Sequence, residues 1–181
     1  MESMMTADIH PTGTDRVAEV AQKVNADLYV IIMGDEPLIS AEDEQALVDS
    51  ISEVEDADAV MLTEKFKNPV DVVNTTTIKL AINNNNELLF MPRTPIPYPK
   101  ASLGYSYYKN IGCYALKKEA LDFFLKTKPG CIEEAEEIEL LRLLEDRKKV
   151  ITVLVDSESM AVDTPKDLER IRKVIAEREN L

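Results

Sequence analysis

Two aspartates follow apolar runs that predict the ends of strands. Asp35 comes after DLYVII (27–32) within MGDEPLIS, and Asp163 lies between SMAV and the predicted last helix. Single carboxylates from two loops that meet at one sheet edge are typical of a Mg²⁺ site for phosphate chemistry, because Mg²⁺ takes one or two carboxylates plus water and phosphate oxygens. The plainer alternatives are a turn at Asp35 before Pro37 and a helix-dipole role for Asp163.

A second polar cluster is HPTGTDR, residues 10–16. It offers the imidazole of His10, the hydroxyl of Thr12, close backbone approach at Gly13 and the guanidinium of Arg16, which together could bind a ligand. The alternative is a plain turn with a helix cap at Thr14. His10 is the chain's one histidine, and with no partner at ligand spacing it does not predict a metal ligand.

Two further segments could contact an anionic ligand or a second subunit. MPRTPIPYPK (91–100) holds four prolines, so we expect a stiff loop that presents Arg93 for bidentate binding of an anion. GYSYYKN (104–110) holds three tyrosines beside Lys109 and predicts either a lid or a subunit contact. EEAEEIE (133–139) is expected to be mostly a solvated helix face, but with Glu139 and Arg142 pointing inward.

Composition limits the class of protein. The chain has 181 residues, 45% of them hydrophobic, and a formal net charge of −13, which predicts one folded domain over residues 1–181 and makes nucleic acid an unlikely partner. A single small nucleotide stays compatible with that charge. Cys113 and Cys131 form no zinc or disulfide pattern, which favours a reducing cytoplasm. No apolar run is long enough to predict a membrane span, and no Walker loop, GxGxxG or HExxH motif is present.

Apolar periodicity predicts strands that alternate with helices. The expected helices cover 15–26, capped by Thr14 or Asp15, then 41–56, capped by Ser40 with Glu44, then 118–127, 135–146 and 164–179. The expected strands cover 27–32, buried on both faces, then 58–65, 108–117 and 149–156, with a hairpin of 76–82 and 87–93 around Asn83–Asn86. This order predicts an α/β, Rossmann-like fold with a mixed, mostly parallel sheet and helices on both faces.

Six stretches, taken together and in order, resemble one family: HPTGTDRVAEV, MGDEPLIS, LLFMPRTPIPYPK, NIGCYALKKEAL, EIELLRLLED and VDTPKDLERIR. They resemble the cytidylyltransferases that activate 3-deoxy-manno-octulosonate (Kdo), over about residues 5–175. The most specific signal is the occurrence of GDEP and VDTPxDLER in this order.

The resemblance implies a nucleotidyltransferase fold and a reaction of CTP with an acidic acceptor, giving a CMP conjugate and pyrophosphate for lipopolysaccharide biosynthesis. It implies a homodimer, and Mg²⁺ held by Asp35 and Asp163, with Arg93 as a third catalytic residue. It also implies substrate contacts from His10, Thr12, Gly13, Arg16, Asn110, Tyr114, Glu139 and Arg142.

Some positions depart from the family pattern. Met33, Asn110 and Leu140 stand where the family usually has Gln, His and Gln, all at the acceptor, and Pro92 replaces the usual Ser before Arg93. Several alternatives therefore stay open: a phosphonate such as 2-aminoethylphosphonate or another nonulosonic acid as the acceptor, a different nucleotide (UTP or GTP), and an inactive remnant of the fold. The chain opens near the family's third strand, so we expect about 70–80 residues, with the phosphate loop, to be missing before it, which leaves the activity of this chain uncertain.

Overall fold

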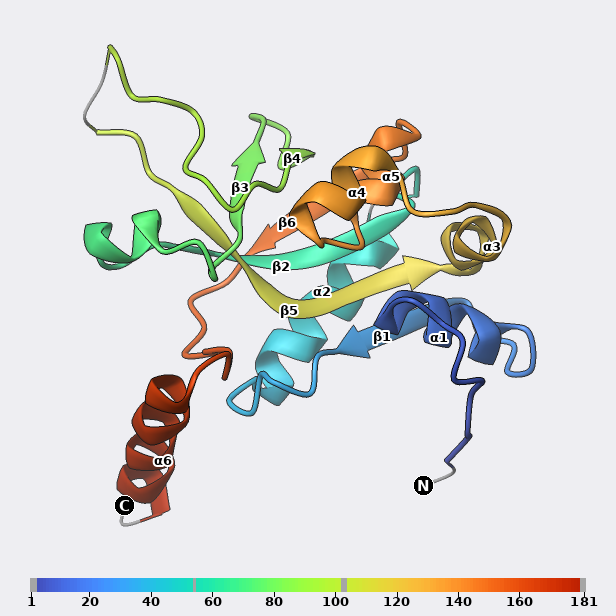
Figure 1. The fold of residues 1–181 in the computed structure, drawn as a ribbon, viewed down its shortest axis with the longest axis horizontal. Helices are drawn as coiled ribbons and strands as arrows, with labels where there is room; N and C mark the ends of the chain where they lie inside the picture. The colour runs from blue at the N-terminus through green and yellow to red at the C-terminus, as the bar shows by residue number, and fades with distance from the viewer. Residues whose placement is uncertain (1–2, 54, 102–103, 180–181) are drawn as a thin grey trace.

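The fold is built on one six-stranded sheet (Figure 1). The computed structural model describes residues 3–53, 55–101 and 104–179. The strands are β1 (Leu28–Ile32), β2 (Ala59–Lys65), β3 (Lys79–Ile82), β4 (Leu88–Phe90), β5 (Tyr108–Lys117) and β6 (Val150–Leu154). Their order is β4-β3-β5-β2-β6, and β1 also pairs with β5.

Strand β5 decides the strand directions of the sheet. It is long enough to pair with β1 along residues 113–117 and with β3 at Tyr108 and Lys109, while β2 runs along its other edge. All three of these pairings are antiparallel, and only β2 and β6 pair in parallel. The α/β prediction is confirmed, but the prediction of a mostly parallel sheet is wrong, because the central β5 runs against its neighbours.

This arrangement still gathers the predicted site at one edge. Strands β1 and β2 are both antiparallel to β5 and therefore share a direction, and β6 is parallel to β2. The carboxyl ends of β1, β2 and β6 consequently face the same way. Asp35 follows β1 and Asp163 follows β6, so the topology places both aspartates at the edge where α/β proteins commonly bind ligands.

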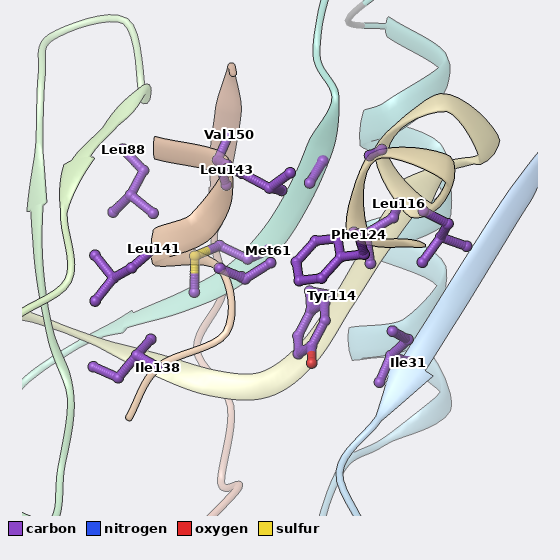
Figure 2. Close-up of a cluster of buried hydrophobic side chains, with 14 of the residues drawn as sticks. Ile31, Met61, Leu88, Tyr114, Leu116, Phe124, Ile138, Leu141, Leu143 and Val150 are labelled. Carbon is purple, nitrogen blue, oxygen red and sulfur yellow. The ribbon is translucent and has the colours of Figure 1, made fainter. Parts of the chain in front are cut away.

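Helices cover both faces of the sheet, as predicted. One apolar cluster packs Ala18, Leu121 and Phe124 with Leu141 and Leu143 against the strands (Figure 2), and a second packs Leu47 against the opposite face. The helices are α1 (Gly13–Ala21), α2 (Ala41–Glu53), α3 (Lys118–Lys126), α4 (Cys131–Glu136), α5 (Leu141–Glu145) and α6 (Pro165–Glu179), with a 3₁₀ turn at Pro69–Val73. No helix among these described residues is long and apolar enough to cross a membrane.

Two helix starts differ in their capping residues. The helix predicted at 15–26 with Thr14 or Asp15 as its cap begins earlier and ends earlier, because α1 covers Gly13–Ala21 and Thr12 is its N-cap. The Thr12 hydroxyl accepts from Asp15 N at 3.2 Å and donates to the Asp15 carboxylate at 2.6 Å. Ser40 caps α2 as predicted, but its reciprocal partner is Asp43 and not Glu44. Position N3, which both aspartates occupy, is the one whose side chain reaches back to the cap. Residue 54, in the predicted helix 41–56, lies outside the described residues.

Two other local predictions are wrong. The helix predicted at 135–146 is instead two short helices, α4 and α5, separated where Glu137 adopts a left-handed φ of 54°. Strand β1 is buried on one face only, since Val30 and Ile32 are exposed. The hairpin, the strands 58–65, 108–117 and 149–156, and helices 118–127 and 164–179 are confirmed within two residues at each strand or helix end, apart from the short hairpin strands.

Candidate active site

The two predicted metal ligands lie on loops that the backbone ties together. Met33 N donates to Gly112 O at 2.8 Å, which fixes the start of the GDEP loop against β5, and Val162 N donates to Asp35 O at 2.9 Å. Both aspartates are exposed. Partial burial, followed by the nearby charge of Asp35, raises the pKa of Asp163. Among the described residues, no lysine or arginine forms a salt bridge with either carboxylate.

A hydrogen-bonded cluster of Glu36, Asp43, Ser157 and Ser159, called the clasp below, joins these two loops. Glu36 accepts from Ser159 Oγ at 2.5 Å and from Gly112 N at 2.9 Å, and burial raises its pKa. Asp43 at the start of α2 accepts from Ser157 Oγ at 2.8 Å. A Cβ at Gly112 would lie 2.8 Å from Glu36 Cγ, so glycine permits this close approach. The clasp fixes the segment that leads from β6 to Asp163.

The residues present fit a magnesium ion. The donor set is two exposed carboxylates of like charge that form no salt bridge within the described part of the chain. Hard carboxylate oxygens are what Mg²⁺ prefers. No group of three or more acidic, histidine or cysteine side chains suited to a metal occurs in the described part of the chain. A site of two carboxylates is therefore one that relies on substrate oxygens and water for its other ligands.

Arg93 is anchored by backbone carbonyls of two other segments. Its Nε donates to Glu136 O at 2.8 Å and its Nη1 to Thr75 O at 3.3 Å, while its backbone N donates to the Glu136 carboxylate at 3.0 Å. Its positive charge lowers the pKa of Asp163, against the larger effect of burial. Arg93 thus acts electrostatically on Asp163, while its guanidinium is held by backbone carbonyls.

The HPTGTDR segment forms the other half of the candidate site. Glu139 accepts from Gly13 N and Thr14 N, both at 2.9 Å, and also from the Thr14 hydroxyl. A carboxylate at the start of a helix satisfies free N–H groups and complements the dipole. Glu139 therefore holds the N-terminus of α1 from the turn between α4 and α5.

Tyr114 completes this contact from the sheet. Its hydroxyl lies 3.0 Å from Thr14 Oγ1 and donates to Glu139 at 3.3 Å. Burial and the charge of Glu139 raise the pKa of Tyr114, so it stays a neutral donor. Figure 2 shows its hydroxyl directed away from Phe124 in the apolar cluster.

A cavity of about 590 Å³ lies in front of this contact. It is lined by His10, Thr12, Gly13, Arg16 and Glu139, together with Pro129 and acidic residues of α4. His10 Nε2 lies 2.6 Å from Glu19, and Arg16 donates to Ala7 O at 2.9 Å. Five predicted substrate contacts therefore share one cavity.

Arg142 does not face that cavity. It is 2% exposed, pairs with Asp15 at 2.9 Å and Glu133 at 2.6 Å, and stacks over the Phe124 ring at 4.4 Å. All of its contacts lie within the chain, so the geometry favours a positioning role for Arg142 over direct contact with substrate. Asn110 lies in β5, where its backbone N donates to Ile78 O at 3.2 Å.

Several residues of the clasp were not predicted as site residues from the sequence. Glu36 was within the quoted MGDEPLIS stretch, and its place beside Asp35 was the available signal. Asp43, Ser157 and Ser159 gave none, because an N-cap partner and two loop serines are common in any α/β protein.

Comparisons with known proteins agree with this geometry. The family model described as "Cytidylyltransferase" matches residues 1–150. The 3-deoxy-manno-octulosonate cytidylyltransferase of Escherichia coli is 31% identical over 97% of this chain and 71% of its own length, and that of Christiangramia forsetii is 35% identical over 92% and 68%. The resemblance drawn from the sequence motifs is therefore confirmed.

Solved structures give the same result. A CMP:2-keto-3-deoxy-manno-octonic acid synthetase complexed with CTP superposes with a TM-score of 0.89 at 31% identity, covering 97% of this chain and 72% of that one. A putative glucose-1-phosphate thymidylyltransferase from Bacillus anthracis, at 15% identity and a TM-score of 0.65, shares the fold. The fold is that of the nucleotidyltransferases, and the chain belongs to the cytidylyltransferase family within them.

Proposed function

We propose that this chain carries the site that transfers CMP from CTP to Kdo, with release of pyrophosphate and with Mg²⁺ held by Asp35 and Asp163. The observation that carries the proposal is the acid pair, which forms no salt bridge among the described residues and is fixed by the clasp at the carboxyl ends of β1 and β6. Relatives named for this reaction support the choice of CTP and of Kdo.

In this reaction a hydroxyl oxygen of the acceptor attacks the α-phosphorus of CTP. A new bond forms between this oxygen and the α-phosphorus, and the bond from the α-phosphorus to the oxygen that bridges to the β-phosphate breaks. Pyrophosphate leaves with the bridging oxygen, and the hydroxyl proton passes to solvent. A bound divalent ion supplies neutralisation of phosphate charge and a lower pKa for the attacking hydroxyl. Nucleotidyl transfer depends on the placement of the two substrates and on neutralisation of the phosphate charge. In this proposal both tasks fall to the side chains of the site.

Each part of the site has a separate task in this proposal. Asp35 and Asp163 orient the ion and the phosphates, while Arg93 binds an anionic group of substrate beside Asp163. The cavity at His10, Thr12 and Gly13 receives the nucleoside. Neighbouring substrate contacts are Arg16, Asn110, Tyr114 and Glu139.

Calorimetric titration of CTP with and without Mg²⁺ tests this proposal. We expect Mg²⁺-dependent binding that favours CTP over UTP, GTP and ATP, and a loss of at least about tenfold in affinity in Asp35→Asn and Asp163→Asn, on the scale of a lost metal contact. Asp49→Asn, on the exposed side of α2, is the matched control and should bind like the wild type. Equal CTP affinity with and without Mg²⁺ would reject the metal assignment.

The acceptor is tested separately by pyrophosphate release with Kdo and with 2-aminoethylphosphonate. Release with Kdo alone supports the proposal, and release with the phosphonate alone replaces the acceptor. Mg²⁺-dependent CTP binding with release for neither acceptor would leave nucleotide binding in place and reject transfer by this chain.

The homodimer stays a prediction. Val70, Val73 and Tyr98 are apolar side chains that are 70% or more exposed, on the turn and the proline-rich loop beside β3, which is compatible with a subunit contact there. Light scattering at micromolar concentration should give twice the mass of the chain, and a single-chain mass would contradict it.

A further inference from the structure

A fully buried lysine, Lys79, binds the backbone carbonyl of Arg93 and forms no salt bridge within the described residues. Lys79 of β3 is 0% exposed, and its ammonium donates to three carbonyl oxygens: Asn74 O, Thr77 O at 2.8 Å and Arg93 O at 2.8 Å. Lysine has three N–H donors and no acceptor, so every donor is used. No salt bridge among the described residues includes Lys79.

This arrangement is costly, so it needs a reason. Burial, and then the charge of Arg93, lower the pKa of Lys79, because a buried cation without a counter-charge loses its hydration. An apolar side chain would avoid that cost but would leave three carbonyls without this donor. The ammonium is thus the group that joins the 74–77 turn to the segment that carries Arg93.

The carbonyls bound by Lys79 lie in the two segments that position Arg93: the 74–77 turn and the backbone of Arg93 itself. Lys79 N also donates to Pro92 O at 2.9 Å, so the backbone on both sides of the Pro92–Arg93 peptide is fixed by one residue. The Arg93 guanidinium in turn donates to Thr75 O, inside the same turn. Any shift of this turn therefore moves both the base and the tip of the Arg93 side chain.

We propose that Lys79 is a positioning residue that fixes the backbone carrying Arg93 and, through the 74–77 turn, the guanidinium of Arg93, and that it touches no substrate itself. The role of Arg93 as an anion ligand rests on the proposed function above. The placement of Arg93 by Lys79 does not, because it is a property of the chain alone and can be measured without substrate.

The first test is hydrogen exchange of the Arg93 Nε–H, followed by NMR. This proton is bound to Glu136 O at 2.8 Å and should exchange slowly in the wild type. Lys79→Met, which removes the ammonium and keeps the length, should speed its exchange at least tenfold. Lys117→Met is the matched control, since Lys117 also donates to a backbone carbonyl, that of Glu55, and shows no contact with Arg93; it should leave the exchange unchanged.

A second variant covers the case in which Lys79→Met does not fold. Lys79→Gln keeps two N–H donors and should give an intermediate rate of exchange. Wild-type exchange in a folded Met or Gln variant would overturn the proposal. Failure of both variants to fold would overturn it too, because Lys79 would then be a requirement of the whole fold and not of Arg93 placement.

The third test is a double-mutant cycle on kcat/KM for CMP transfer. If Lys79 acts through Arg93, the pair Lys79→Met/Arg93→Met should lose no more activity than Arg93→Met alone. Additive losses would show a merely structural role and overturn the proposal. If the wild type does not transfer CMP, the proposed function fails, and the exchange measurement still decides the role of Lys79.

Discussion

Two groups of charged side chains in this protein use charge in opposite ways. Around Arg142, one buried cation is paired with two carboxylates, Asp15 and Glu133, so the cation has its counter-charges inside the chain. At Asp35 and Asp163, two exposed carboxylates lie near each other without a cationic salt-bridge partner among the described residues. The first arrangement is complete without a ligand, and the second is electrostatically favourable only when a cation joins it.

This difference separates positioning from binding. The Arg142 cluster joins α1, α4 and α5 and so fixes one wall of the cavity lined by His10, Thr12 and Gly13. The acid pair carries a repulsion that a metal ion would relieve. Arg142, Asp35 and Asp163 were all predicted as site residues, and their partners in the structure distinguish them.

Among the variants that test this comparison, Arg142→Met should have the largest effect on stability. It leaves Asp15 and Glu133 buried without their cation, so we expect a loss of about 3–5 kcal/mol in the free energy of unfolding. Urea denaturation would measure it. The triple variant with Asp15→Asn and Glu133→Gln should recover most of the loss. A change below about 1 kcal/mol in Arg142→Met would mean that the cluster is not the compensated unit described above.

Glu139→Ala should have an intermediate effect. It removes the carboxylate from Gly13 N and Thr14 N, which costs about 1–3 kcal/mol for unsatisfied groups, and it should also weaken CTP binding by loosening the cavity wall. Denaturation together with CTP titration checks both effects. Glu134→Ala, an exposed residue lining the same cavity, is the control, and an equal loss there would contradict the capping role.

Asp163→Asn should have a smaller effect of opposite sign. The pKa of Asp163 is raised from 3.8, so the folded state holds this proton more tightly, and stability falls as the pH rises above that value. Removing the charge should therefore raise the melting temperature at pH 7 without metal, by roughly 1–2 °C for an exposed like-charge pair.

We expect Mg²⁺ and CTP to raise the melting temperature of the wild type, and the same Asp163→Asn variant should lose that increase. Scanning calorimetry with and without Mg²⁺ measures both effects, with Asp49→Asn as the reference. A lower melting temperature for Asp163→Asn without metal would show that this carboxylate is already compensated.

The smallest effect belongs to Glu19, which contacts the cavity residue His10. Hydrogen bonds from Lys23 and then His10 hold the pKa of Glu19 at about 2, below its usual 4.5. A depressed acid pKa gives stability that is present above pH 4.5 and is lost as the pH falls toward 2. Glu19→Gln should flatten the pH dependence of unfolding in that window only; an unchanged slope there would contradict this pairing.

The sequence located most strands and helices because their apolar periodicity is local. The predictions from the sequence were wrong where tertiary contacts determine the local structure. The 135–146 segment has an apolar stripe suited to one helix, but the left-handed Glu137 breaks it and lets Glu139 reach α1. Strand β1 is apolar on both faces, yet Val30 and Ile32 stay exposed, since burial depends on what packs against a strand.

The sequence by itself determined the family, the order of the elements and the residue types at the site. These follow from motifs and from spacing along the chain. The tertiary structure alone decided which charges find partners: Arg142 is enclosed by Asp15 and Glu133, Lys79 is held by three carbonyls, and Asp35 and Asp163 stay open to a cation. The physical reason is that charge compensation depends on distance and burial in space, and residues 127 positions apart, as in the contact between Asp15 and Arg142, leave no trace of that pairing in a single sequence.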